Sequence, residues 1–324
     1  METLKVRDIK DVEEVVRAAV ASEQPLEVIG HGSKRAIGHP MPTNAVLDVS
    51  VLNAVSAYEP NELIITVEAG APLADVQSLI DAKNQQFAFE PMDISVLLGA
   101  AGAGTIGGMI GAGLAGPRRI KAGGIRDHLL GAHAVSGFGD SFKTGGRVVK
   151  NVTGYDLCKL LTGSWGTLAV MTEVTLKVMP KPEAERTLVL RSLDDVTANK
   201  AMTAALGSPF DVSGAAHLPG SVLRSGTGAL AGLAASGQPV TLVRLEGISA
   251  SAAHRAASLS QTLSSYGTVD SLADDASVAI WSALRDVVPF AANGALGAWP
   301  VWRIVCPPAS GGALGQALAR STGG

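Results

Sequence analysis

Two glycine-rich stretches hold the residues of this sequence best suited to chemistry. The longer one spans residues 99–116 as GAAGAGTIGGMIGAGLAG, in which eight of eighteen residues are glycine, five are alanine and none is charged. Each glycine costs roughly 1 kcal/mol against alanine in a helix interior, and glycine gives a strand no side chain to pack. Such backbone can instead approach a large, flat or anionic ligand closely. The composition therefore predicts a cofactor loop.

Three alternatives compete for this stretch. Gly102, Gly104 and Gly107 spell G-x-G-x-x-G, with Asp127 about 20 residues on and 94–98 as a candidate strand, which is the pattern of a Rossmann fold. The following glycines argue against the helix that this motif requires.

The second alternative is a membrane-spanning helix, because 94–117 carries no charge and includes a GxxxG pair. Glycine and alanine, however, drive insertion only weakly. The third alternative is a packing loop without a ligand.

The shorter stretch is Gly30-His31-Gly32-Ser33-Lys34, which follows the apolar run 26–29. A strand that opens onto consecutive N–H groups, a hydroxyl and a cation has what a pyrophosphate requires. It lacks the G-x-x-x-x-G-K-[ST] spacing of a Walker A loop. An ordinary surface turn remains the alternative.

Composition excludes several classes of protein. The chain has 324 residues, enough for two domains, with 47% hydrophobic and 17% charged residues. A net charge of −3 gives no general attraction to nucleic acid or anionic lipid. Two cysteines allow no disulfide framework and no cysteine metal site, and the charged N-terminus has no apolar signal core. These features favour a cytoplasmic globular protein.

Hydrophobic periodicity predicts alternating strands and helices. Helices are expected at 11–21, 72–80, 194–206, 250–265 and 276–288. Strands are expected at 26–29, 45–49, 63–68, 129–136, 141–149, 169–178, 187–191, 240–246 and 299–305. The Pro180-Lys181-Pro182 run predicts a domain boundary, and the composition of 220–237 predicts a loop.

Motifs in one order carry a resemblance to a known family. They are GLAGPRR at 113–119, Arg126-Asp127, KNVTGYDL at 150–157, Gly163-Ser164 and Thr172-Glu173. On these residues the sequence resembles the FAD-binding domain of the vanillyl-alcohol oxidase/p-cresol methylhydroxylase (PCMH) type, and within it the FAD-binding subunits of bacterial glycolate oxidases. The resemblance implies an α+β fold, with a two-subdomain FAD-binding PCMH-type domain over 1–180 and a smaller cap-like α+β domain over 181–324.

The resemblance also implies which residues bind FAD. Backbone N–H groups of the first loop would hold the pyrophosphate, and the second stretch would line its other face and the ribityl chain. A glycine would admit the flavin, and a strand residue would reach the ring or the ribityl chain. The expected cofactor-binding residues are Gly30, His31, Gly32, Ser33, Lys34, Thr105, Ile106, Gly107, Gly108, Gly111 and Val170.

The sequence departs from the wider family in three places. Ser33 stands where flavoproteins with covalent FAD carry histidine, and His31 lies two places earlier, so noncovalent FAD is expected. Trp165 stands in a Gly-Ser-Trp-Gly run where the 2-hydroxy-acid dehydrogenases have Gly-Ser-Glu-Gly. The sequence stops at Gly324, before the Pro-x-Gly-rich segment with which relatives end, so the cap-like domain is expected to be truncated or divergent.

Candidate catalytic residues stay unassigned. Oxidation of a 2-hydroxy acid requires a cation for the carboxylate and a base for the hydroxyl proton. The second half offers His217 and His254 as bases, and Arg118 with Arg119 could clamp a carboxylate. Neither histidine lies in an obvious motif, and a strand end explains His217 and a solvated helix face explains His254. A surface or subunit-facing basic pair explains Arg118 and Arg119 at least as well as a clamp. No metal-ligand spacing or catalytic triad is present.

The resemblance implies an FAD-dependent oxidoreductase acting on CH–OH groups, as the FAD-binding subunit of a complex that oxidises glycolate to glyoxylate. Its implied partners are a larger FAD-containing catalytic subunit and an iron–sulfur subunit, with no nucleic acid and no transmembrane segment. The implied location is cytoplasmic, at the inner face of the membrane through these partners. The alternatives are a self-sufficient FAD-dependent 2-hydroxy-acid dehydrogenase and a structural subunit that has lost its flavin.

Overall fold

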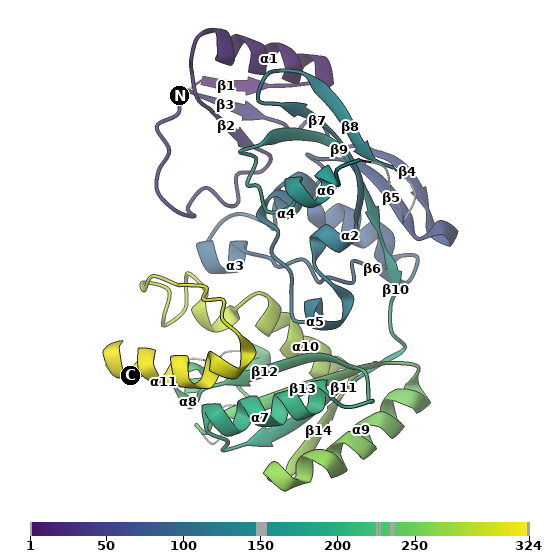
Figure 1. Ribbon diagram of the computed structural model, residues 1–324, viewed down its shortest axis with the longest axis vertical. Coiled ribbons are helices and arrows are strands. Elements are labelled where there is room, and N and C mark those ends of the chain that lie inside the picture. The colour runs from purple at the N-terminus through teal and green to yellow at the C-terminus, as the bar shows by residue number, and fades with distance from the viewer. Residues whose placement is uncertain (1, 147–153, 225, 227, 234–236, 323–324) are drawn as a thin grey trace. The chain divides into compact units, whose positions relative to one another are not determined.

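The computed structural model describes residues 2–146, 154–224, 226, 228–233 and 237–322. These residues form two compact units, the first comprising Met1–Gly116 and Gly123–Lys181 and the second comprising Pro117–Ala122 and Pro182–Gly324 (Figure 1). Residues 147–153 lie outside the described residues, and with them Lys150, Asn151, Val152 and Thr153 of the KNVTGYDL motif and the end of the expected strand 141–149.

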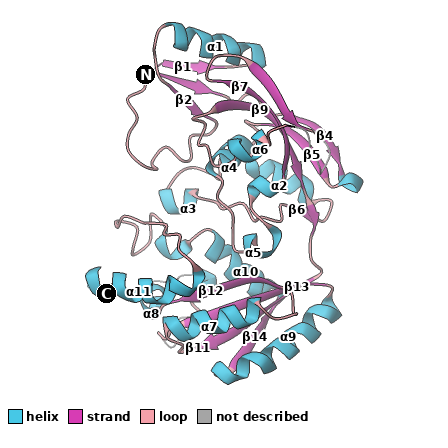
Figure 2. Ribbon diagram, viewed as in Figure 1, coloured by secondary structure: helices cyan, strands magenta, loops and turns pink. Residues whose placement is uncertain are grey.

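The first unit combines two sheets with several helices (Figure 2). Its strands are β1 (Glu2–Lys5), β2 (Leu26–Ile29), β3 (Ala45–Asp48), β4 (Val55–Glu59), β5 (Ile64–Glu68), β6 (Gln85–Gln86), β7 (Leu129–Ser136), β8 (Ser141–Gly145), β9 (Ala169–Lys177) and β10 (Met179–Pro180). Its helices are α1 (Ile9–Ala21), α2 (Leu73–Asp81), α3 (Ser95–Leu98), α4 (Ile106–Ala112) and α6 (Leu157–Leu161), with 3-10 turns η1 (Pro60–Glu62) and η2 (Ile125–Asp127).

The two sheets of this unit differ in strand direction. The smaller one is parallel in the order β1-β3-β2, and Val12 and Val16 of α1 share a buried cluster with Leu47 of β3. The larger one is antiparallel in the order β4-β5-β9-β7-β8. Its main core contains Ile65 and Leu176 together with residues of α2 and α4. The first glycine loop follows β2, so the parallel sheet positions it.

Helix α4 corrects the expectation that the glycine tract is too glycine-rich for a helix. Thr105 caps its N-terminus by accepting a hydrogen bond from the Gly108 N–H, and Gly113, at φ +64°, ends it. A Cβ atom on Gly107 would lie 2.9 Å from the carbonyl oxygen and the Cβ of Ala69. Close packing therefore requires glycine at this position. This packing outweighs the low helix propensity of glycine. The candidate strand 94–98 is also helical, as α3.

The second unit has a βαββαβ core. Its strands are β11 (Ala184–Arg191), β12 (Val212–Leu218), β13 (Val240–Gly247) and β14 (Val269–Ala273). Its helices are α5 (Arg119–Ala122), α7 (Asp195–Leu206), α8 (Gly220–Arg224), α9 (Ser249–Leu263), α10 (Asp274–Arg285) and α11 (Gly311–Thr322), with 3-10 turns η3 (Gly228–Leu230), η5 (Ser264–Tyr266), η6 (Val288–Phe290) and η7 (Pro308–Ser310).

The strand order β12-β13-β11-β14, with every pair antiparallel, is the ferredoxin-like arrangement. Side chains alternate between the two faces of this sheet. Leu188 and Leu190 join α7 and α9 in one buried cluster, whereas Val189 joins Ile280 and Trp281 of α10 in another. The sheet therefore has apolar cover on both faces.

Ionic groups are buried on the α10 face of this sheet. Arg118 donates to both carboxylate oxygens of Glu246, the closest contact being 2.7 Å, and the Arg244 guanidinium stacks on Trp281 at 4.6 Å. Glu185 accepts a hydrogen bond of 2.6 Å from Ser277. Burial raises the pKa of Glu185 to about 7, although Ser277 and Arg244 oppose the shift. Burial would also raise the pKa of Glu246, but the hydrogen bond from Arg118 and the charge of Arg244 lower it to about 2.

We expect Glu185→Gln to stabilise the second unit in a pH-dependent way. The folded-state pKa of about 7 lies above the ordinary value of 4.5 for a glutamate, so ionisation of Glu185 destabilises the folded unit as pH rises through this range. The glutamine variant lacks this loss and should be about 3 kcal/mol more stable than wild type at pH 8, with little difference at pH 4. Urea unfolding at both pH values checks this, and a difference independent of pH would contradict it.

Most expected elements are confirmed, including the strands 26–29 and 240–246 and the helices near 11–21 and 194–206. The expected strand 299–305 is wrong, because these residues have no regular secondary structure. Trp299 and Trp302 are 71% and 83% exposed, whereas Trp281 is buried. The expected loop 220–237 contains α8 and η3 in its described part.

Candidate functional site

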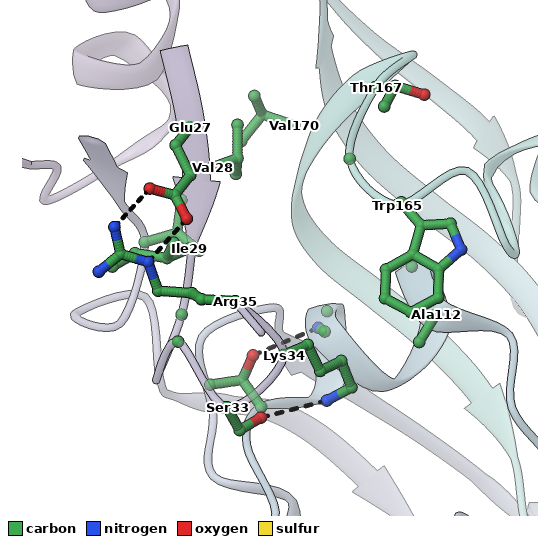
Figure 3. A pocket seen from close by; sticks show the side chains of 18 of the residues that line it. Glu27, Val28, Ile29, Ser33, Lys34, Arg35, Ala112, Trp165, Thr167 and Val170 are labelled. Carbon is green, nitrogen blue, oxygen red and sulfur yellow. Dashed lines mark hydrogen bonds and ion pairs between the residues drawn. The ribbon is translucent and has the colours of Figure 1, made fainter. Parts of the chain in front are cut away.

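A cavity of about 610 Å³ opens in the first unit (Figure 3). Three segments line it: β2 with the loop that follows, the stretch 105–112 that includes α4, and the start of β9 with the turn before it. Ser33 and Lys34 lie on one side of the close-up, and Thr167 and Val170 lie on the other. We call these the polar end and the apolar end.

The polar end is built where the two glycine stretches meet. A Cβ on Gly30 would lie 2.5 Å from Thr105 Oγ1, and one on Gly104 would lie 2.5 Å from Ser33 Oγ. Only glycine permits both approaches. Ser33 is 6% exposed, and its hydroxyl accepts a hydrogen bond of 3.3 Å from Lys34 Nζ. Burial lowers the pKa of Lys34, with the charge of Asp93 opposing the shift. A half-buried ammonium group beside a hydroxyl suits an anionic ligand.

Backbone donors are distributed unevenly between the two stretches. The N–H groups of Ile106 and Gly107 donate to Ala71 O at 2.9 Å and Ala69 O at 2.7 Å, and that of Gly108 donates to Thr105 Oγ1. Within the part of the chain that the structure describes, no protein acceptor is bonded to the N–H groups of residues 31–34. The first loop therefore has donors for a phosphate, and the second stretch supplies a close wall.

The apolar end suits a flat ring. It is lined by Gly111, Ala112, Trp165, Val170 and Met171. A Cβ on Gly111 would lie at van der Waals distance from the turn before β9, with Gly166 N at 3.8 Å, so the backbone of α4 and this turn pack closely here. An apolar wall with few polar groups is typical of sites for ring-containing cofactors.

Ten of the eleven expected cofactor-binding residues line this one cavity: Gly30, His31, Gly32, Ser33, Lys34, Thr105, Gly107, Gly108, Gly111 and Val170. Ile106 does not line it and is fully buried in the main core. The roles of these residues toward FAD stay predictions.

No sequence motif pointed to the segment 37–43 or to the Glu27–Arg35 pair as part of the cavity lining. Arg35 Nη2 lies 2.6 Å from Glu27 Oε2, and an ion pair this exposed contributes little to stability.

The four candidate catalytic residues do not form a common site. His217 Nδ1 lies 2.9 Å from Thr241 Oγ1, and His217 Nε2 lies 3.2 Å from Asp195 Oδ1. Burial lowers the pKa of His217, and the charge of Asp195 opposes this shift. His254 is exposed on α9, and Arg119 is exposed on α5. Arg118 is engaged by Glu246. Among the described residues, no cluster of three or more His, Cys, Asp or Glu side chains is arranged to hold a metal ion.

FAD fits the cavity on chemical grounds, because its pyrophosphate needs cations and N–H donors and its ring needs an apolar wall. Comparison with known proteins agrees: residues 3–145 match the family of the FAD binding domain. The matched segment therefore resembles an FAD binding domain.

Among individual proteins, the chain is similar to subunits of glycolate oxidases. The chain is 39% identical over 175 residues to glycolate oxidase subunit GlcE of Escherichia coli K12. The aligned region covers 54% of this chain and 48% of that protein. It is 30% identical over 210 residues to glycolate oxidase subunit GlcD of Bacillus subtilis 168, and this aligned region covers 61% of this chain and 43% of that protein. The matched region thus spans about half the length of these relatives.

Solved structures show the same fold. p-Cresol methylhydroxylase with substrate bound matches at a TM-score of 0.67 and 15% identity, covering 91% of this chain and 64% of that one. Alkyldihydroxyacetonephosphate synthase matches at 0.67 and 14%, covering 89% and 55%. The α+β fold expected from the sequence is confirmed. None of the described helices is both long and apolar enough to cross a membrane.

Proposed function

We propose that this chain is the FAD-binding subunit of a complex that oxidises glycolate to glyoxylate. The similarity to GlcE, together with one cavity that gathers ten expected FAD-binding residues, carries the proposal. In this assignment 1–180 is the FAD-binding domain and 181–324 is a cap-like domain. The flavin supplies a two-electron acceptor for the carbon that bears the substrate hydroxyl.

We further propose that the FAD is held without a covalent bond. Ser33, which stands at the place of the linking histidine, is buried in the cavity wall, and His31 is exposed. Acid precipitation of the flavin-loaded chain should release all of the flavin into the supernatant. Yellow colour that stays with the precipitate would contradict noncovalent binding.

The proposed role is accessory, with substrate oxidation in a larger FAD-containing subunit and electrons passed to an iron–sulfur subunit. The proposed location is cytoplasmic, at the inner face of the membrane through these partners. Two observations support a role in flavin binding more than in substrate chemistry. Arg118 is engaged by Glu246, and His217 is held by Thr241 and Asp195.

The test is the visible absorption spectrum of the purified chain, followed by anaerobic addition of glycolate. Bound flavin that glycolate bleaches only when the partner subunits are present supports the proposal. Bleaching in the isolated chain would favour a self-sufficient dehydrogenase, a role consistent with the similarity to D-lactate dehydrogenase of Anaerostipes hadrus at 29% identity. A chain that stays colourless after reconstitution with FAD would contradict flavin binding and favour the third possibility, a structural subunit that has lost its flavin.

Lys34→Met is expected to weaken FAD binding about tenfold or more, because a charge-assisted hydrogen bond to a phosphate is lost. ADP should lose affinity by a similar factor, and riboflavin, which has no phosphate, should be unaffected. Isothermal titration of the apo-chain measures all three. Lys83→Met changes an exposed lysine of the same unit outside the cavity lining and should leave FAD affinity unchanged. An equal loss in both variants would contradict the role of Lys34.

A further inference from the structure

Trp165 adopts a backbone conformation that its side chain does not favour. Its φ is +55°, in the left-handed region, which costs a bulky residue roughly 1–2 kcal/mol. It lies between Ser164 and Gly166 in the turn before β9. Such strain persists only where the surrounding structure enforces it, and it occurs most often at functional sites.

Two hydrogen bonds enforce this conformation. The Trp165 N–H donates to Gly111 O at 2.9 Å, and the Gly163 N–H donates to Ile110 O at 3.0 Å. Both acceptors are carbonyls near the C-terminal end of α4. The opposite end of α4 begins at Thr105, which lines the cavity against the first loop. Helix α4 therefore fixes the Trp165 turn relative to the polar end.

The indole ring itself is available to a ligand. Trp165 lines the cavity and is 46% exposed, whereas Trp281 of the second unit is 1% exposed. Figure 3 shows the ring beside Ala112, on the side of the cavity opposite Glu27 and Arg35. A large aromatic surface in a cavity wall gains free energy when another flat ring covers it.

We infer that the indole of Trp165 forms the wall against which the flavin ring packs. This inference rests on the proposed FAD binding and adds a positioning residue to it. Trp165 contacts the isoalloxazine system, while Ser33 and Lys34 hold the phosphates. The strained turn orients the indole for this contact.

Ligands that contain only half of FAD test the inference. Trp165→Ala should weaken FAD binding about tenfold and leave ADP binding unchanged, because ADP carries the phosphates without the ring. Trp165→Phe should keep most of the FAD affinity. Trp302→Phe, which changes an 83% exposed tryptophan of the second unit, is the matched control.

Fluorescence provides a second measurement. An indole in contact with isoalloxazine quenches flavin emission by electron transfer, so bound FAD should be brighter in Trp165→Phe than in wild type or Trp302→Phe. Wild-type affinity for FAD in Trp165→Ala, or equal losses for FAD and ADP, would overturn the inference while FAD binding itself stands. A wild-type chain that binds neither ligand would overturn the proposed function and this inference together.

Discussion

Gly111→Leu is expected to weaken FAD binding by at least about 100-fold, or about 2.7 kcal/mol, while leaving the first unit folded. The nearest atoms to a Cβ at this position are Gly166 N at 3.8 Å and Trp165 Cα at 3.9 Å, so a Cβ fits at van der Waals distance without a shift of the backbone. Leucine also has the higher helix propensity. Its branched end would occupy the apolar end of the cavity, where the flavin ring is proposed to lie.

Flavin titration and thermal unfolding of the same preparation separate binding from folding. Gly137→Leu is a matched control, because Gly137 has no atom within 4 Å of a built Cβ and does not line the cavity. It should bind FAD as wild type does. Unchanged FAD affinity in Gly111→Leu would show that the flavin ring lies elsewhere.

Glu246→Ala is expected to lower the free energy of unfolding of the second unit by about 3–5 kcal/mol. The Glu246 side chain is 7% exposed and faces Arg118 at 2.7 Å and Arg244 at 3.6 Å, whose side chains are 12% and 1% exposed. Removing this carboxylate leaves both guanidinium groups without its charge in a medium that solvates ions poorly. Fluorescence of the buried Trp281 during urea unfolding reports the loss.

The comparison variant is Asp275→Ala, which removes an exposed carboxylate from the first turn of α10. It should change the free energy of unfolding by no more than about 0.5 kcal/mol. A cost below about 1 kcal/mol for Glu246→Ala would mean that water reaches the two arginines freely, contrary to their burial.

The cavity could be predicted from the sequence in large part, because glycine requirements are local. Gly30 and Gly104 each stand where a Cβ would strike the other stretch. The absence of Ile106 from the cavity lining has a physical reason. In an extended loop neighbouring residues all have access to a ligand, but in helix α4 Ile106 and Ile110 are four residues apart and share the core face. The helical conformation of residues 106–112 thus determines which of them face the cavity and which face the core.

Long-range partners could not be predicted. Arg118 looked like a surface cation or a carboxylate clamp, and its partner Glu246 lies 128 residues further along the chain. The run 299–305 has the composition of a strand, but strand formation needs a neighbour to pair with, and sequence composition does not reveal one. His217 is similarly defined by Asp195 and Thr241, neither of which is adjacent in sequence.

The insertion of Pro117–Ala122 into the second unit has a consequence for how the protein is made. Arg118 is synthesised long before Glu246. The ion pair between them therefore forms only after more than a hundred further residues have been added to the chain. A gene fragment that starts at residue 182 would encode Glu185, Glu246 and Arg244 without Arg118. Its product would leave the buried Glu246 without its nearest cation, and supplying 117–122 as a peptide should stabilise it.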